Sequence, residues 1–117
     1  MKVSELEGDA LDYWVGRALG FFPQRRRIPI GAYTENSLVN LEGYYWECRP
    51  STVWEDGGPL IQLASIEVGP EMDFWVARCE HDALASGVRS SYSKGYTPLI
   101  AAMRCFVASK LGPEVQK

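Results

Sequence analysis

Residues 95–113 read Gly-Tyr-Thr-Pro-Leu-Ile-Ala-Ala-Met-Arg-Cys-Phe-Val-Ala-Ser-Lys-Leu-Gly-Pro, and this stretch decides the fold. Thr97 stands where a helix needs an N-cap oxygen, and Pro98 follows at a position where a missing N–H does no harm. Gly112 and Pro113 provide a stop. The helix between them, about four turns long, is apolar around most of its circumference. We therefore expect it to be buried on more than one side and to form the central element.

The large and small side chains of this helix separate on a helical wheel. One side gathers Leu99, Ile100, Met103, Phe106, Val107 and Leu111. The other side carries Ala101, Ala102, Cys105, Ala108 and Ser109, with Arg104 among them. Small residues allow another backbone to approach closely. This side could therefore pack against the rest of the fold or against a second subunit across a two-fold axis. We expect a simple exposed alanine face, with a symmetric homodimer as the next alternative.

Length and composition predict one globular domain, residues 1–117. A chain of 117 residues with 46% hydrophobic and 23% charged residues is ordinary for such a domain. The net charge of −3 argues against a dedicated nucleic-acid binder. The longest apolar run, Leu99 to Met103, is far shorter than the about 20 residues of a membrane span, and the acidic N-terminal segment does not resemble a signal peptide. We expect a cytoplasmic protein that has no membrane association.

The cysteines and the single histidine offer little chemistry. Cys48, Cys79 and Cys105 are odd in number and unevenly spaced, so we expect buried free thiols in a reducing compartment. Cys79 and His81 would share one face of a strand and could hold a metal or form a Cys–His pair. A zinc site needs four ligands, and no second close pair exists. We therefore predict an exposed His81, no metal and no cofactor.

Hydrophobic spacing predicts the remaining elements. Leu11, Trp14, Val15 and Ala18 fall at i, i+3, i+4 and i+7, which predicts an amphipathic helix that ends near Gly20, with Asp9, Asp12 and Gly16 on the opposite side. This helix begins either at a Ser4–Glu7 capping box or at Gly8-Asp9 after a short strand over residues 2–6. Residues 21–42 are predicted to be a loop, either packed on the core through Phe21, Phe22 and Ile28 or partly mobile.

From Gly43 onward the pattern predicts extended structure. The expected order is a strand over 43–49, a loop over 50–59, one or two strands over 60–68, a turn at 69–73, a strand over 74–79, and a polar segment over 81–96 with a short strand or helical turn. Helix, strands and helix in this order indicate an α+β fold. We expect a small antiparallel sheet of three to five strands, with the N-terminal and C-terminal helices packed on one face.

Two segments are candidate binding sites. The first is the loop containing Trp54, whose side chain either anchors the loop to the core or stands exposed as part of a partner surface. The candidate partner-binding residues are Ser51, Thr52, Trp54, Asp56 and Arg104. The second segment is the basic run Arg25, Arg26 and Arg27, which is either a solvated loop or a weak, salt-sensitive site for nucleic acid.

Three blocks of sequence together resemble the NinX-like family of small, uncharacterised proteins of lambdoid-type phages and prophages. The blocks are Ser4-Glu5-Leu6-x-Gly8-x-x-Leu11-Asp12-Tyr13 with Val15 and Gly20, Pro50-Ser51-Thr52-x-Trp54-x-x-Gly57-Gly58-Pro59-Leu60-Ile61, and the run from Thr97 to Gly112 with Glu114-Val115. Trp75-Val76-Ala77 adds a weaker fourth block. Residues 21–42 depart from the family pattern, so the resemblance gives the basic run no role.

The resemblance implies an accessory product encoded near phage recombination and late-regulation genes, with no established activity and no catalytic residues. We therefore expect a non-enzymatic accessory protein in the bacterial host cell that binds a host or phage protein, with homodimerisation as a further possibility. Weak nucleic-acid association through Arg25–Arg27 is the alternative. An unrecognised enzyme that uses Cys79, His81 or Asp56 ranks last.

Overall fold

The structure of the chain is a computed structural model that describes residues 1–24, 26–27, 33–34, 37–83 and 87–116. For residues 26–27, 33–34, 81–83 and 87–90 it describes the backbone alone. The helical elements are η1, a 3-10 helix (Val3–Glu5), α1 (Gly8–Ala18), α2 (Trp54–Leu63) and α3 (Pro98–Leu111). The strands are β1 (Phe22–Pro23), β2 (Arg26–Arg27), β3 (Tyr33–Thr34), β4 (Leu38–Val39), β5 (Glu67–Glu71), β6 (Phe74–Ala83) and β7 (Gly87–Gly95). The fold is α+β, as predicted.

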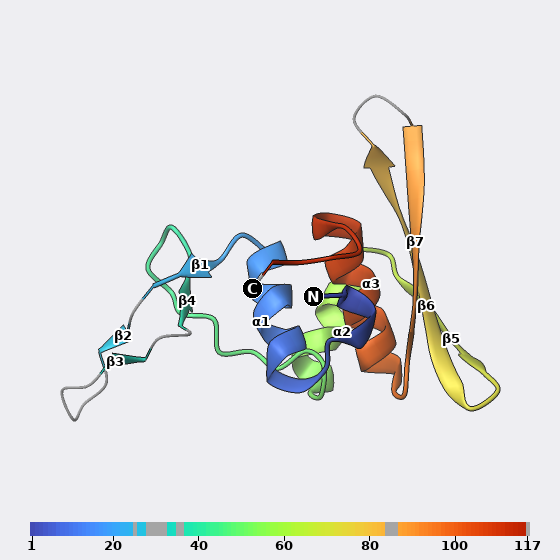
Figure 1. Ribbon diagram of the computed structural model, residues 1–117, viewed down its shortest axis with the longest axis horizontal. Coiled ribbons are helices and arrows are strands. Elements are labelled where there is room, and N and C mark those ends of the chain that lie inside the picture. The colour runs from blue at the N-terminus through green and yellow to red at the C-terminus, as the bar shows by residue number, and fades with distance from the viewer. Residues whose placement is uncertain (25, 28–32, 35–36, 84–86, 117) are drawn as a thin grey trace.

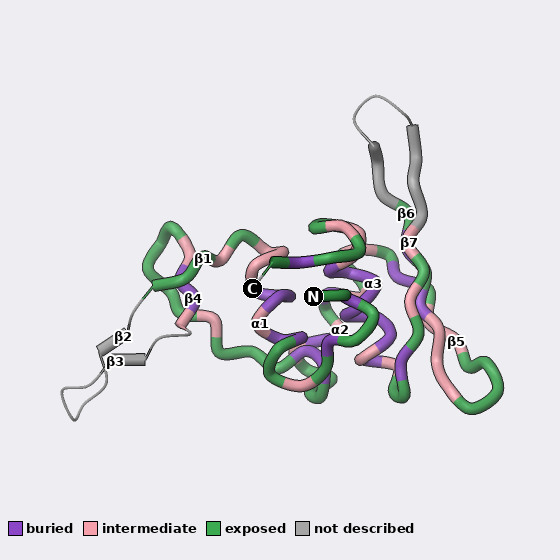
Figure 2. The backbone as a smooth tube through the Cα atoms, in the orientation of Figure 1, coloured by how far each residue is buried: buried purple, intermediate pink, exposed green. Residues whose placement is uncertain are grey.

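Helix α3 is the central element, and its predicted ends are confirmed. The Thr97 Oγ1 accepts a hydrogen bond from the Ile100 N–H at 3.1 Å, so the N-cap forms as the sequence indicates. The Gly112 N–H donates to the Ala108 carbonyl at 2.9 Å at the other end. Residues on every side of the helix are buried (Figure 2). The burial of α3 on more than one side is therefore confirmed.

The prediction of an exposed alanine face on α3 is wrong. Ala101, Ala102 and Cys105 are fully buried, because β6 and β7 cover one side of α3 while α1, α2 and η1 cover the other (Figure 1). Small residues do permit close approach here, but the approaching backbone belongs to the same chain. A Cβ atom added at Gly95 of β7 would lie only 2.5 Å from the Ala101 nitrogen.

The main sheet is antiparallel in the order β5-β6-β7, which agrees with the predicted number of strands. Helix α3 lies against this sheet, and α1 and α2 pack behind α3 (Figure 1). Both terminal helices therefore lie on the same side of the sheet, with α1 one layer further out. Strand β7 is nine residues long, which exceeds the short strand that its polar sequence suggested. No helix in the part of the chain that the structure describes is long and apolar enough to cross a membrane.

Strands β1 to β4, within residues 21–42, project away from the helices (Figure 1), and we call these four strands the ribbon. Strand β1 pairs with β4 and β2 pairs with β3, both antiparallel. The sequence predicted a loop here, because strands of two residues leave no readable periodicity. Phe21 packs on the Trp46 ring with centroids 5.3 Å apart, whereas Phe22 is exposed and Ile28 lies outside the described residues.

Residues 43–63 differ most from the prediction. The expected strand over 43–49 is wrong, since only an isolated bridge joins Tyr45 to Val39. The expected loop over 50–59 and strand over 60–63 are also wrong, because Trp54–Leu63 is helix α2 despite Pro59 inside it. Tertiary packing explains the helix: Gly57 and Leu60 are buried, and a Cβ at Gly57 would meet the Pro50 carbonyl oxygen at 2.5 Å and Leu99 at 2.7 Å.

The start of α1 settles the alternatives that the sequence left open. The helix begins at Gly8, and its N-cap Glu7 makes no side-chain capping bond, so the Ser4–Glu7 capping box does not form. The expected strand over residues 2–6 is replaced by η1 and by an isolated bridge between Lys2 and Glu114. Asp12 and Gly16, which were expected on the solvent side of α1, are buried.

Candidate functional site

A groove of about 700 Å³ lies between α1 and the segment 46–49, and we call it the α1 groove. Helix α1 contributes Asp9, Ala10, Asp12, Tyr13, Trp14 and Arg17 to its lining. The opposite wall consists of Leu38, Trp46, Glu47, Cys48 and Arg49, and Met1 and Gln116 complete the lining. The size lies in the range of ligand-binding clefts, which makes the α1 groove the first candidate for a binding site.

The segment 46–51 is held antiparallel to α1 by specific contacts. The Trp46 Nε1–H donates to the Asp12 carbonyl oxygen at 2.9 Å, and a Cβ at Gly16 would lie 2.7 Å from the Trp46 ring. Five residues later, the Ser51 N–H donates to Asp12 Oδ1 at 2.8 Å, and its hydroxyl reaches the Gly8 carbonyl at 3.5 Å. The absence of a side chain at Gly16 is therefore what allows Trp46 to dock on α1 and close one wall of the groove.

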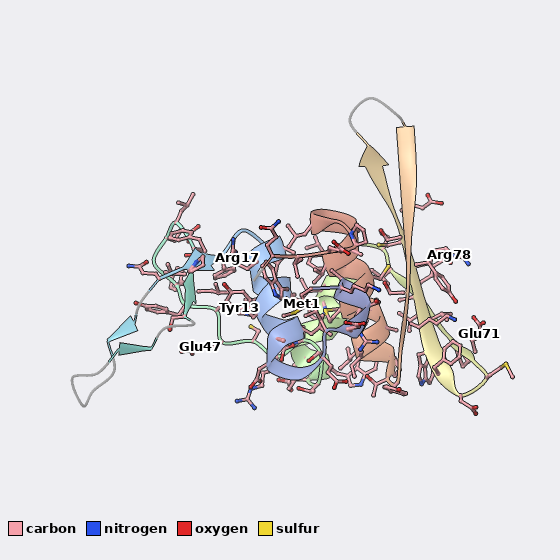
Figure 3. All side chains as sticks on the ribbon, in the orientation of Figure 1. Met1, Tyr13, Arg17, Glu47, Glu71 and Arg78 are labelled. Carbon is pink, nitrogen blue, oxygen red and sulfur yellow. The ribbon has the colours of Figure 1, made fainter. Side chains whose placement is uncertain are left out.

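The α1 wall of the groove carries one stripe of side chains at helical spacing. Asp9, Tyr13 and Arg17 follow at i, i+4 and i+8, so they share a face of the helix. The Arg17 Nη1 donates to the Tyr13 hydroxyl at 3.2 Å, and its guanidinium carbon lies 5.3 Å from the centre of the Trp14 ring. Figure 3 shows Tyr13, Arg17 and Glu47 together on the side of α1 that faces the ribbon.

Trp54 is the first residue of α2 and directly follows a turn over residues 49–53 that hydrogen bonds hold. The Asp56 Oδ2 accepts a hydrogen bond from the Arg49 N–H at 2.8 Å, and the Arg49 carbonyl accepts from the Thr52 and Val53 N–H groups. Ser51, at the centre of the turn, is 1% exposed. Trp54 is 59% exposed. The core-anchor alternative for Trp54 is therefore wrong, and the side chain is exposed as its other alternative requires, while its part in a partner surface stays a prediction.

Two titratable groups beside the turn have shifted acidities. Burial is the main cause that raises the pKa of the Asp12 carboxyl, and the Ser51 hydrogen bonds oppose this shift. Cys48 is exposed, contrary to the prediction of three buried thiols. Partial burial and then the Asp56 carboxylate raise the pKa of the Cys48 thiol, which keeps this thiol protonated at neutral pH. The Cys48 environment therefore does not activate a nucleophile.

Arg104 occupies a position inside the fold. It is 7% exposed, and its guanidinium donates to two carbonyl oxygens: from Nε to Leu6 at 2.8 Å and from Nη1 to Lys94 at 2.8 Å. Burial lowers the pKa of Arg104, which still carries its charge at neutral pH. The side chain joins α3 to β7 and to Leu6, the residue that follows η1, so little of it remains for a partner to contact.

The structure describes the remaining candidates only in part. Cys79 and Cys105 are buried with their sulfur atoms 3.2 Å apart, so Cys79 faces α3. The side chain of His81 lies outside the described part, as does residue Arg25, and the side chains of Arg26 and Arg27 are likewise not described. The metal-binding, Cys–His and nucleic-acid alternatives of these residues therefore stay predictions. Among the described residues, no three His, Cys, Asp or Glu side chains are grouped to hold a metal ion.

The outer face of the main sheet carries pairs of rings and charges. The Tyr92 hydroxyl donates to Glu71 Oε2 at 3.3 Å, and the Arg78 guanidinium carbon lies 6.0 Å from the centre of the Tyr92 ring (Figure 3). The Lys94 Nζ lies 4.8 Å from the centre of the Phe74 ring. These contacts place Glu71, Arg78 and Lys94 beside aromatic side chains of the same face.

A comparison with protein families now identifies the chain. The family model described as "Bacteriophage P22, NinX" matches residues 2–110. The chain belongs to this family. The resemblance drawn from the three sequence blocks is thus confirmed, and the match to the NinX family also spans residues 21–42, where the sequence pattern showed no resemblance. A comparison with curated proteins finds no match.

Sequence reasoning missed the α1 groove because its two walls come from segments about 35 residues apart. Tyr13, Arg17, Cys48 and Arg49 were not proposed as site residues, and the strand expected over 43–49 would have placed Trp46 on a sheet. One signal was present in the sequence: Asp9, Tyr13 and Arg17 form a polar and aromatic stripe opposite the apolar face of α1.

Proposed function

We propose that this member of the NinX family is a non-enzymatic phage accessory protein that acts by binding another protein, and that Trp54 is the central contact. The observation that carries this proposal is the 59% exposure of Trp54, the first residue of α2, directly after a turn held by hydrogen bonds. Tryptophan is enriched among the residues that dominate protein interfaces, and a preordered position reduces the entropy lost on binding.

The surroundings of Trp54 support a protein partner. Val53 is 37% exposed and Thr52 is exposed, so the tryptophan adjoins a further apolar side chain and a polar edge. Ser51 and Asp56 serve in this arrangement as supports, since both hold the turn through hydrogen bonds. Membership in a phage protein family fits an accessory role but names no partner.

The test is an affinity purification from the phage host with three tagged proteins: the natural chain, Trp54→Ala and the control Leu63→Ala. Leu63 is 73% exposed at the other end of α2, so both variants remove one exposed apolar side chain from the same helix. We expect a specific protein to be retained by the natural chain and Leu63→Ala but lost by Trp54→Ala. With the purified partner, Trp54→Ala should weaken binding by about 2 kcal/mol, or ~30-fold.

Thermal unfolding of the same variants controls for the fold. Because Trp54 is exposed, Trp54→Ala should unfold within a few degrees of the natural chain, about 1 kcal/mol or less. A large loss of stability would show that Trp54 supports the fold. Equal capture of the same partner by all three proteins would contradict the proposed role of Trp54.

A further inference from the structure

We propose that the α1 groove binds a short extended peptide segment of a partner protein, uncharged overall and with apolar side chains facing the groove. This inference rests on the proposed function in that the protein acts by binding proteins. It concerns a different surface from Trp54, and either surface can be tested without the other.

The dimensions of the groove fit a short peptide. The α1 wall runs from Asp9 to Arg17, and eight residues of helix at 1.5 Å each give a length of about 12 Å. An extended chain advances about 3.3 Å per residue, so about four residues fit along this wall. The volume of about 700 Å³ leaves room for their side chains.

The wall opposite α1 offers main-chain hydrogen bonds. The segment 46–49 forms neither helix nor strand, and it runs antiparallel to α1. Within the described part of the chain, the Cys48 N–H and C=O have no hydrogen-bond partner. In an antiparallel sheet, each residue of a hydrogen-bonded pair donates its N–H to the C=O of the other. Cys48 can therefore form one such pair with a residue of an added strand. The exposed edge at Cys48 therefore favours an extended peptide over a helix or a rigid protein surface.

The charges of the groove favour a neutral ligand. Asp9, Asp12 and Glu47 are balanced by Arg17, Arg49 and the Met1 ammonium group, and the α1 stripe places an acid at one end and a base at the other. Arg17 is already engaged by Tyr13 and Trp14, so its charge is not reserved for a ligand carboxylate. A strongly basic or acidic segment would therefore meet repulsion at one end. The three rings of Tyr13, Trp14 and Trp46 are complementary to apolar or aromatic side chains.

The experiment selects displayed random dodecapeptides on the full chain and counter-selects on Ala10→Trp. Ala10 is an exposed residue of the α1 wall, so the indole should fill the groove without disturbing the core. Leu63→Trp, which adds the same ring at an exposed site on α2, is the control. A selected synthetic peptide is then titrated against the natural chain, Ala10→Trp, Leu63→Trp and Trp54→Ala. Tyr13→Ser, which removes one ring of the groove, serves as a second groove variant if Ala10→Trp does not fold.

The reactivity of Cys48 locates the bound peptide. Cys48 is exposed while Cys79 and Cys105 are buried, so iodoacetamide should alkylate Cys48 in the folded chain and spare the other two. We expect the peptide to slow this alkylation, and we expect the groove variants to weaken peptide binding about tenfold or more, with Leu63→Trp and Trp54→Ala unaffected.

Other results overturn the inference. It fails if no peptide is enriched over the Ala10→Trp counter-target, if a peptide binds the groove variants as well as the natural chain, or if Cys48 stays equally reactive. Loss of peptide binding in Trp54→Ala alone would place the peptide at Trp54, which overturns the groove site while supporting the proposed function. If no partner is found that depends on Trp54 while the peptide still binds the groove, the proposed role of Trp54 fails and the groove inference holds.

Discussion

Helices α2 and α3 lie next to each other in the fold, but they are specified in different ways. Helix α3 has a side-chain N-cap from Thr97, a proline at its first position and a glycine after its last residue. Helix α2 has none of these: Val53 makes no side-chain cap, and two glycines and Pro59 lie within it. Local signals therefore define α3, while α2 depends on what its neighbours provide. This difference explains why one helix was predicted and the other was not.

The largest expected effect comes from Arg104, which tests how far α3 depends on its packing. Arg104→Met keeps a long apolar side chain but leaves the carbonyl oxygens of Leu6 and Lys94 without their donors. We expect a loss of about 3 kcal/mol in the free energy of unfolding, measured by urea denaturation. The control is Lys110→Met, at an exposed site on the same helix, with a change below about 0.5 kcal/mol. Equal stability of the two variants would show that Arg104 does not hold Leu6, α3 and β7 together.

The second effect tests α2 through its two adjacent glycines. Gly57→Ala would place its Cβ 2.5 Å from the Pro50 carbonyl oxygen, so we expect a loss of about 2 kcal/mol. Gly58→Ala meets no atom within 4 Å, and alanine is the better helix former, so we expect a gain of about 0.5 kcal/mol. Thermal or urea unfolding of the pair measures this difference. If both alanines stabilise the protein, the close packing of α2 on Pro50 is refuted.

The third effect measures the local signal of α3. Thr97→Ala removes the oxygen that accepts from the Ile100 N–H, and we expect a loss of about 1 kcal/mol in the free energy of unfolding. Thr97→Ser keeps a hydroxyl and should retain most of the stability. A serine variant as unstable as the alanine variant would mean that the threonine methyl group, and not the cap, is responsible.

The smallest effect concerns Asp12, which holds the turn before α2. Because the pKa of Asp12 is raised in the folded state, the native protein binds more protons than the unfolded chain between pH 3.8 and the raised value. The contribution of Asp12 to stability therefore falls as pH rises through this window. Asp12→Asn keeps an oxygen for the Ser51 N–H but does not titrate. We expect urea unfolding to show Asp12→Asn gaining stability relative to the natural chain as pH rises, and a gain as pH falls would contradict the shift.

The two candidate surfaces, like the two helices, differ in how far the sequence could predict them. Trp54 could be singled out from sequence because a tryptophan beside turn-forming residues has few roles. Its exposure could not be predicted, because it depends on the hydrogen bonds that Asp12 and Asp56 make to the turn. The α1 groove could not be predicted at all, since Trp46 docks on Gly16 only when residues 30 apart meet. The strand expected over 43–49 would have placed Trp46 on a sheet, whereas its ring packs on α1.

The sequence by itself determined the position and ends of α3, the apolar face of α1, the antiparallel strands around Phe74–Cys79 and the family. These features rest on interactions within a few residues of the chain, such as caps and hydrophobic periodicity, which can be read locally. The tertiary structure alone decided that residues 54–63 are helical, that Arg104 is buried and that α1 and residues 46–49 enclose a groove. These features depend on contacts between distant segments. In α2, the burial that these contacts provide outweighs the low helix propensity of Gly57, Gly58 and Pro59.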